Sequence, residues 1–279
     1  MADTVARSSW TEILALARTY RRLVGARIRS DWQYRTSFFF FLASQTVVTA
    51  LDLAVILVLF EVVPQLGGWS VEQVAVLYGL TTLAFGLGDL FISQVETAAR
   101  YIREGSFDRF LLRPLPTVLQ LSASEFALRR IGRSIPAAVT LAVALVVADI
   151  DWTVDRVVLV PVTVLSGTAI FGAVWVVTSS ISFWAVGAQE VANSFTYGGS
   201  FAHQYPLHIY ARWIRTVLGW IVPMAFVAYV PAVHILDAAN PLGLPDWLAV
   251  TPPFVAVASV WVARSVWAAA IRNHQSTGS

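Results

Sequence analysis

The sequence predicts an all-α integral membrane protein with six transmembrane helices, and three observations support that fold class. Hydrophobic residues make up 57% of the 279 residues and charged residues only 13%, whereas soluble domains average about 25% charged residues. The apolar residues gather in six runs, close to the roughly 20 residues that cross a hydrocarbon core. The arginines gather on alternate sides of these runs, which is the pattern of a multi-pass membrane protein.

An amphipathic helix is expected before the first span, in "EILALARTYRRLVGARIRSDW". Its apolar residues fall on one helical face and its arginines mostly on the other, as in helices that lie in the membrane interface. A solvated helix that only fixes the topology has the same pattern. Both interpretations place the helix directly before the first span, and both stay open at this point.

Six spans follow, and their expected bounds are 36–62, 71–93, 134–148, 157–184, 214–236 and 248–271. The third is expected to extend backwards as one long helix through "EFALRRIGRS". Proline bends helices, so Pro161 should bend the fourth span, and Pro223 and Pro231 the fifth. The stretch 185–213 is too polar for a span and is expected on the side of the N-terminus, unless it extends the fourth span or dips back into the membrane.

The arginines predict the orientation, because basic residues collect in the loops that stay in the cytoplasm. With a cytoplasmic N-terminus every arginine except Arg156 lies on the cytoplasmic side, Arg212 and Arg215 included. Both ends of the chain are therefore predicted to be cytoplasmic. The expected organisation is an amphipathic N-terminal segment at 1–35, a six-helix transmembrane domain at 36–272 with a cytoplasmic loop at 94–116, and a short tail at 273–279.

Two missing residue types limit the chemistry of this chain. All 19 basic residues are arginine, and a phosphate-binding P-loop needs a lysine to reach the phosphates. Any nucleotide that drives the protein must therefore bind to another chain. The absence of cysteine excludes a thiolate metal site, and a net charge of +2 gives no sign of nucleic-acid binding.

Catalytic and metal sites are also not expected. His203 and His208 lie close in sequence, but a zinc site needs three or four ligands and no further ligand is near them. No nucleophile motif such as Gly-x-Ser-x-Gly occurs. We therefore expect no metal, no cofactor and no catalytic residue in this chain, and we do not expect an enzyme.

The loop between the second and third spans contains the charged stretch "REGSFDRFLLRPLP", residues 103–116. Gly105 is expected to end one short helix, and Pro114 and Pro116 to stiffen the exit. The helix between them has an apolar face formed by Phe107, Phe110 and Leu111. This face is expected to be exposed between flanking arginines and to dock into a groove of a partner protein. An interfacial helix on anionic lipid is the alternative.

The pattern "IREGSFDRFLLRPLP" after two spans resembles the permease subunits of ABC-2-type ABC exporters. The later "YPLHIYARWIR" and "IVPMAFVAYVPA" are similar to the branch of short six-span permeases that are encoded in pairs beside a separate ATPase. In that family the loop between spans two and three carries a coupling helix that sits in a cleft of the cytoplasmic ATPase. The resemblance implies that the coupling residues here are Arg103, Glu104, Phe107, Asp108, Arg109, Phe110, Arg113 and Pro114.

The resemblance also implies partners and a location. An ATPase subunit dimer would bind ATP and Mg²⁺, and a second permease, related or identical, would complete the translocation path. The complex would lie in a bacterial cytoplasmic membrane and export an amphipathic or hydrophobic small molecule, such as a drug or a lipid-like compound, as in multidrug efflux.

Two acidic residues fall within the expected spans. Asp52 lies in the first span and Asp89 near the inner end of the second, and carboxylates at membrane depth face protein or water. Both are candidates for a substrate path, although Asp52 is favoured as a structural hydrogen-bonding residue and Asp89 could meet an arginine. The alternatives to an exporter are an ion- or proton-coupled carrier or channel that uses Asp52 without an ATPase, and a membrane enzyme that uses His203 or His208.

Overall fold

The computed structural model describes residues 10–32, 35–124, 126–185 and 189–274, and within these ranges it contains helices but no β-strand. Five of the described helices are long and apolar enough to cross a membrane. They are α2 (Arg35–Val62), α3 (Val71–Phe91), α7 (Ile131–Val147) with the 3₁₀ turn before it, α8 (Val154–Ser180) with the 3₁₀ turn after it, and α12 (Pro252–Arg272). The expected all-α membrane architecture is therefore confirmed, and these helices lie close to five of the six expected spans.

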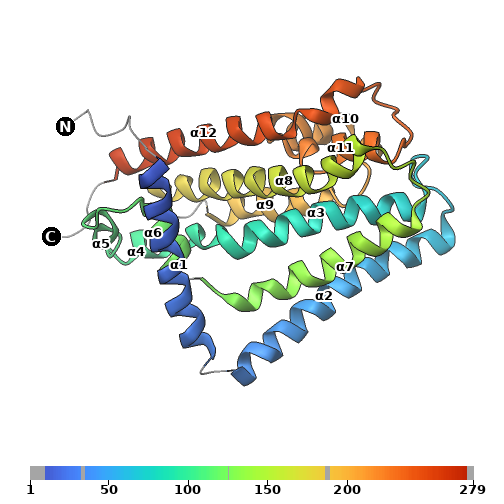
Figure 1. Ribbon diagram of the computed structural model, residues 1–279. Helices are drawn as coiled ribbons and strands as arrows, with labels where there is room; N and C mark the ends of the chain where they lie inside the picture. The colour runs from blue at the N-terminus through green and yellow to red at the C-terminus, as the bar shows by residue number, and fades with distance from the viewer. Residues whose placement is uncertain (1–9, 33–34, 125, 186–188, 275–279) are drawn as a thin grey trace.

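The core of the bundle lies between α3 and α8, which pack side by side (Figure 1). The Phe85 ring of α3 meets the Phe171 and Trp175 rings of α8, with centroids 5.1 and 4.8 Å away. α7 packs so closely on α3 that a Cβ at Gly79 would lie 2.8 Å from the Cα of Leu141. Most of α3 is buried, as expected for a helix that is apolar on every side.

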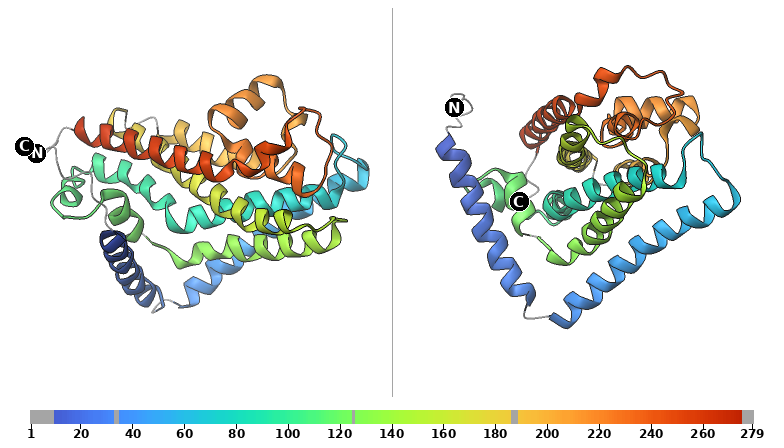
Figure 2. Two further views of the ribbon diagram at one scale, coloured as in Figure 1. Left: turned by 45° about the horizontal axis from the view of Figure 1, so that its top comes forward. Right: turned by 45° about the vertical axis from the view of Figure 1, so that its right-hand side comes forward.

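α2 lies at the edge of the bundle, beside α7 (Figure 2). Most of its side chains are exposed, including Phe40 (70%) and Val58 (66%). A large exposed apolar face marks a contact with lipid or with another protein chain. α2 therefore has a surface available to the bilayer or to a partner.

The two ends of the bundle differ in charge. One end, here called the basic end, holds α1 (Trp10–Trp32), the loop between α3 and α7, and the last turn of α12 (Figure 1). Most of the exposed arginines belong to these segments. α1 crosses the basic end at a steep angle to the bundle (Figure 2), and the Tyr20 hydroxyl donates to the Phe91 carbonyl at 3.3 Å.

The third span is not preceded by one long helix, so that expectation is wrong. α6 (Thr117–Ser124) is separate from α7, because Ala127 is extended (φ −130°, ψ 102°) and one 3₁₀ turn then leads into α7. This break turns the chain at the basic end. It also lets Arg130 reach α3, where it forms an ion pair with Asp89.

The expected fifth span is not one continuous helix, because the chain bends sharply within it. Its two halves, bent by 73°, are Arg212–Ile221 and Met224–Ile235. Just before the first half, a His208 ring nitrogen lies 2.8 Å from the Gly67 carbonyl oxygen, and in the second half a His234 ring nitrogen lies 3.0 Å from the Asp155 carboxylate. Gly67 and Asp155 both belong to the end opposite the basic end. The two halves therefore enter and leave the bundle at the same end, as a re-entrant pair.

α9 (Gln189–Ala202) and the turn after it connect the two ends instead. Tyr197 of α9 bonds to Glu96 at the basic end, the His203 carbonyl accepts a hydrogen bond from Thr81 within α3, and His208 reaches the opposite end. The expectation that 185–213 stays on the side of the N-terminus is therefore wrong.

This course also changes the distribution of the arginines. Arg212 and Arg215 begin the re-entrant pair at the opposite end, where Arg156 lies as well. Two of the arginines that we assigned to the side of the N-terminus therefore lie at the opposite end. Most of the arginines still lie at the basic end.

Candidate functional site

The loop between α3 and α7 forms a compact helical unit at the basic end (Figure 1). Its first half is a 3₁₀ turn, Ser93–Thr97, followed by α4 (Ala98–Arg103). α4 ends in a Schellman motif, since the Ser106 N–H donates to the Tyr101 carbonyl (2.9 Å) and the Gly105 N–H to the Ile102 carbonyl (3.1 Å). α5 (Asp108–Leu111) then begins directly after the turn.

Gly105 is needed at this turn because its φ is +63°, where a side chain is strained. We expect Gly105→Ala to lower the free energy of unfolding by about 1 kcal/mol. Thermal unfolding of the purified protein measures the change. Gly198→Ala in α9 is the matched control, because nothing lies within 4 Å of the added Cβ and alanine favours a helix. Equal losses in both variants would contradict the role assigned to Gly105.

The apolar face of the loop is buried within this chain, so the expectation of an exposed face is wrong for Phe107 and Phe110. Their exposed fractions are 0% and 4%. The Phe107 ring meets the rings of Phe183 and His274 edge to face, with centroids 5.0 and 5.3 Å away, and Phe110 packs on Tyr101 at 5.0 Å. A short amphipathic helix has to cover its apolar face, and here the ends of α8 and α12 cover it.

Polar contacts hold the same unit in place. A His274 ring nitrogen lies 3.1 Å from the Asp108 carboxylate, which joins the loop to the end of α12. The Gln120 amide of α6 donates to the carbonyls of Phe110 (2.9 Å) and Leu115 (2.7 Å). The α4–α5 part of the loop is thus fixed to α6 within the loop and to the ends of α8 and α12. A force applied to it would reach most of the bundle.

The exposed side of the loop is mostly charged. Among the expected coupling residues, those exposed to solvent are Arg103, Glu104, Arg109, Arg113 and Pro114. Leu112, which the sequence analysis did not single out, is 85% exposed. These residues form the outer surface of the loop, and Phe107 and Phe110 support it from beneath.

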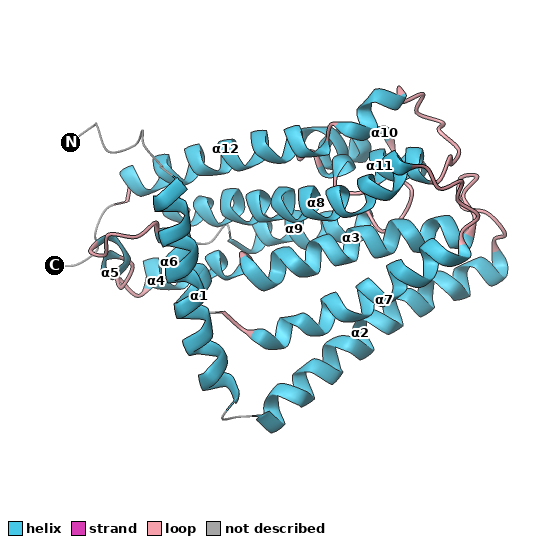
Figure 3. Cartoon of the chain, viewed as in Figure 1, coloured by secondary structure: helices cyan, strands magenta, loops and turns pink. Residues whose placement is uncertain are grey.

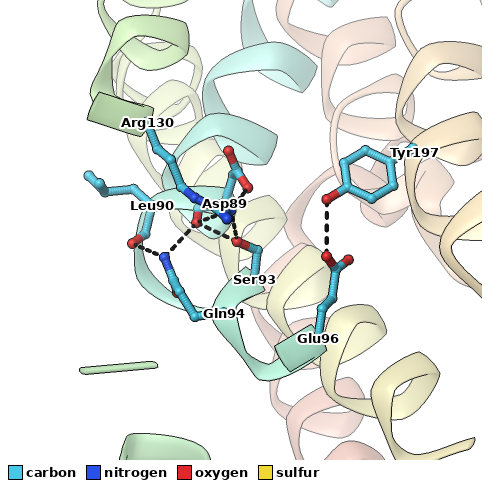
Figure 4. Close-up of polar contacts among 7 residues, drawn as sticks. All are labelled: Asp89, Leu90, Ser93, Gln94, Glu96, Arg130 and Tyr197. Carbon is cyan, nitrogen blue, oxygen red and sulfur yellow. Dashed lines mark hydrogen bonds and ion pairs between the residues drawn. The ribbon is translucent and has the colours of Figure 1, made fainter. Parts of the chain in front are cut away.

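Asp89 forms an ion pair with Arg130, as the sequence suggested for this carboxylate (Figure 4). Arg130 also donates to Ser93 Oγ. Gln94 donates to the carbonyls of Asp89 and Leu90, at 3.2 and 3.0 Å. Asp89 is only 5% exposed, and a buried charge has to be paired. This network ties the end of α3 to the start of α7.

A second carboxylate at the basic end lies beside this network. The Tyr197 hydroxyl of α9 donates to Glu96 at 3.3 Å (Figure 4). Burial raises the pKa of the Glu96 carboxyl above its usual value, although this hydrogen bond acts in the other direction. The contact joins the loop unit to α9.

Asp52 lies on a small polar cavity between α2, α3, α7 and α9. The cavity has a volume of about 160 Å³, and its polar lining includes Thr49, Thr81, Arg133, Ser200 and Gln204. Arg133 and Tyr197 also line a neighbouring cavity of about 260 Å³, which contains Asp89, Arg129 and Arg130. The structure thus places both candidate carboxylates on adjoining polar cavities, with arginines beside each.

A large apolar cavity lies on another side of the bundle. It has a volume of about 720 Å³ between α8, α9 and α12, and the tip of the re-entrant pair lines it through Ile221, Val222 and Pro223. Its other lining residues are almost all apolar. Such a cavity suits a hydrophobic ligand or a lipid chain.

The two histidines considered for catalysis serve as hydrogen-bonding residues. The ring nitrogens of His208 lie 2.9 Å from the Tyr229 hydroxyl and 2.8 Å from the Gly67 carbonyl oxygen. His203 is buried, and its Nδ1 lies 2.7 Å from the Gly199 carbonyl oxygen. No group of three or more histidine and acidic side chains in the described residues could hold a metal ion.

Comparison with known proteins identifies the family. The family model described as "ABC-2 family transporter protein" matches residues 46–278. The chain belongs to the ABC-2 transporter family. Neither the search of curated proteins nor the search of solved structures gives a match. As a member of the ABC-2 family, the chain is a multi-pass membrane protein and a transport component, and this confirms the family resemblance seen in its sequence.

Proposed function

We propose that this chain is the membrane-spanning permease subunit of an ATP-driven exporter, with ATP and Mg²⁺ bound by a separate ATPase dimer. Membership of the ABC-2 family supports this function, as does the absence of lysine, because a P-loop needs one. The basic end would face the cytoplasm of a bacterium, since basic residues collect on that side. α1 would then lie along the inner membrane surface.

The observation that carries the proposal is the construction of the loop between α3 and α7. Its outer side presents Arg103, Glu104 and Leu112, while its inner side is fixed to α8 and α12 through Phe107. A charged surface with two exposed leucines, Leu111 and Leu112, suits a groove in a partner protein. Because the unit is fixed to several helices, a movement of the ATPase would be passed into the bundle.

A second permease would complete the translocation path. The exposed apolar face of α2 supports such a partner, since large apolar patches mark contacts with protein or lipid. The large apolar cavity against α8 and the polar cavity at Asp52 support an amphipathic or hydrophobic substrate. Asp52 and Asp89 remain our candidates for the path.

Gentle purification of the tagged protein from its native membrane, with mass spectrometry of the co-purifying chains, tests the proposal. We expect a nucleotide-binding chain and a second multi-pass chain. In the double variant Arg103→Glu with Leu112→Glu, the amount of nucleotide-binding chain that co-purifies should fall about tenfold or more. The reason is that a central contact residue contributes about 2 kcal/mol to the binding free energy. Arg156→Glu with Trp247→Glu makes the matched change at the opposite end and should retain it.

Two outcomes would contradict the proposal. In the first, the variant at the basic end still co-purifies with the nucleotide-binding chain, and the control variant at the opposite end does not. The second is a protein that purifies alone and moves solute in vesicles without ATP. The second outcome would favour the carrier or channel, and Asp52 would then be the first residue to replace.

A further inference from the structure

The apolar cavity between α8, α9, α12 and the re-entrant pair lies at membrane depth, because α8 and α12 are both long and apolar enough to span a membrane (Figure 1). Its volume of about 720 Å³ is within the range of about 300–1,000 Å³ that is usual for small-molecule sites. Phe195, Ile221 and Val262 of its lining are exposed. A molecule can therefore reach the cavity without passing through the core of the bundle.

The lining of this cavity, as far as the structure describes it, contains no charged residue. A charged molecule that entered would lose its hydration and gain no counter-charge, which is unfavourable. The two polar cavities at Asp52 and Asp89 differ in this respect, because both are also lined by Arg133. The apolar cavity therefore favours uncharged molecules.

Two hydrogen-bond donors of the lining have no partner, and this is a second and independent observation. The Ser259 hydroxyl and the Trp220 indole N–H form no hydrogen bond with any residue in the described part of the chain. Ser265 of the same helix, in contrast, donates to the Trp261 carbonyl at 2.9 Å. Ser259 and Trp220 are both partly exposed, so a ligand can reach them. Donors in an apolar environment are costly unless they are hydrogen-bonded, so a ligand with an acceptor would complete the site.

Three aromatic side chains line the same cavity. Phe195 comes from α9, and Trp220 and Phe226 come from the two halves of the re-entrant pair. The rings of Trp220 and Phe226 meet edge to face, with centroids 5.6 Å apart. An aromatic ligand extends this packing, because such ring pairs gain more than the area they bury. A lipid acyl chain makes no ring pair and leaves the two donors without a partner.

We propose that this cavity binds an uncharged aromatic molecule with a hydrogen-bond acceptor, such as a diaryl ketone, and that such molecules are the substrate class of the exporter. Ser259 and Trp220 supply the donors for the acceptor, and the aromatic side chains pack on the rings. Binding requires only this chain. The assignment as substrate class rests on the proposed function.

Benzophenone is the probe, because it is uncharged and aromatic, has a carbonyl acceptor, and attaches to nearby C–H groups under ultraviolet light. The protein is purified with its co-purifying chains, placed in phosphatidylcholine nanodiscs and irradiated, and peptide mass spectrometry locates the label. The blocking variant is Ala258→Trp, which places a large ring on the lining. The matched control is Val257→Trp, because Val257 is the preceding residue of α12, is 71% exposed and does not line the cavity.

We expect label on the lining segments in the parent and in Val257→Trp, and loss of this label in Ala258→Trp. Ser259→Ala should bind benzophenone about fivefold more weakly, the usual loss for one neutral hydrogen bond. Ser265→Ala should bind it as the parent does. Equal labelling of the parent and Ala258→Trp would overturn the proposal. Equal competition by diphenylmethane, which lacks the carbonyl, and by unlabelled benzophenone would overturn the requirement for an acceptor. Equal melting temperatures of all variants exclude misfolding.

Two further readouts separate this inference from the proposed function. If the ATPase co-purifies but benzophenone labels no lining segment, the cavity is filled by lipid or by a partner chain, and only this inference is overturned. If the segments are labelled but no ATPase co-purifies, the proposed function fails and the binding site remains. ATP hydrolysis by the complex should respond to benzophenone in the parent and not in Ala258→Trp. No response in the parent would overturn the assignment as substrate class.

Discussion

Replacing Phe107 with alanine is expected to lower the free energy of unfolding by about 3–5 kcal/mol, the usual cost of truncating a buried phenylalanine. Phe107 is fully buried, and its ring meets Phe183 at the end of α8 and His274 at the end of α12. The substitution removes these contacts together and leaves a cavity beneath the loop. The effect should be large because one side chain fixes the loop to two other helices.

Chemical unfolding in detergent, followed by tryptophan fluorescence, measures this change. Leu112→Ala is the matched control from the same loop, because Leu112 is 85% exposed and exposed substitutions usually stay within about 0.5 kcal/mol. The proposed function assigns the ATPase contact to Leu112, so Leu112→Ala should weaken ATPase binding more than Phe107→Ala does. If Phe107→Ala were as stable as the parent and bound no ATPase, Phe107 would belong to the docking surface after all.

The burial of Phe107 marks the limit of what the sequence could predict for this site. The spacing of Phe107, Phe110 and Leu111 shows that a short helix has one apolar face, and burial of such a face stabilises a protein. The spacing does not show whether the covering surface belongs to the same chain or to a partner. The covering residues, Phe183 and His274, are distant in sequence, so no local pattern connects them to the loop.

The sequence predicted correctly the spans that are single long apolar helices, because length and composition alone identify them. A run such as α2 has enough apolar residues to cross the hydrocarbon core in one helix. The re-entrant pair also has the length and apolar character of a span, so a composition argument treats it as one. Pro223 was the available signal, since a proline in the middle leaves two halves that are each too short to cross alone.

The sequence analysis did not recognise that α9 crosses between the two ends of the bundle, because α9 is too short and too polar to resemble a span. Its 14 residues include Asn193, Ser194 and Ser200, and a polar helix of this length does not look like a span. It can lie within the bundle because its polar groups meet partners there, such as Glu96 for Tyr197. The sequence also could not place Arg212 and Arg215 correctly, because their side depends on whether α9 crosses.

Replacing Arg130 with glutamine is the second change with a large expected effect, a loss of about 3–5 kcal/mol. Arg130 is the ion-pair partner of Asp89, which is 5% exposed and lies near the basic end of α3. Removing one member of a buried pair leaves the other charge without compensation, which costs more than the pair contributes. The start of α7 should then separate from α3, because the Ser93 contact is lost as well.

A double-mutant cycle tests this explanation. Arg130→Gln with Asp89→Asn should recover most of the lost stability, since a neutral amide pair leaves no unpaired charge. The matched control is Arg129→Gln, an exposed neighbour whose guanidinium lies 5.2 Å from the Phe41 ring centre and which should cost less than about 1 kcal/mol. Equal losses in the single and double variants would show that Asp89 needs no counter-charge. Asp89 would then be a free carboxylate on the polar cavity, and its place in the substrate path would become the stronger explanation.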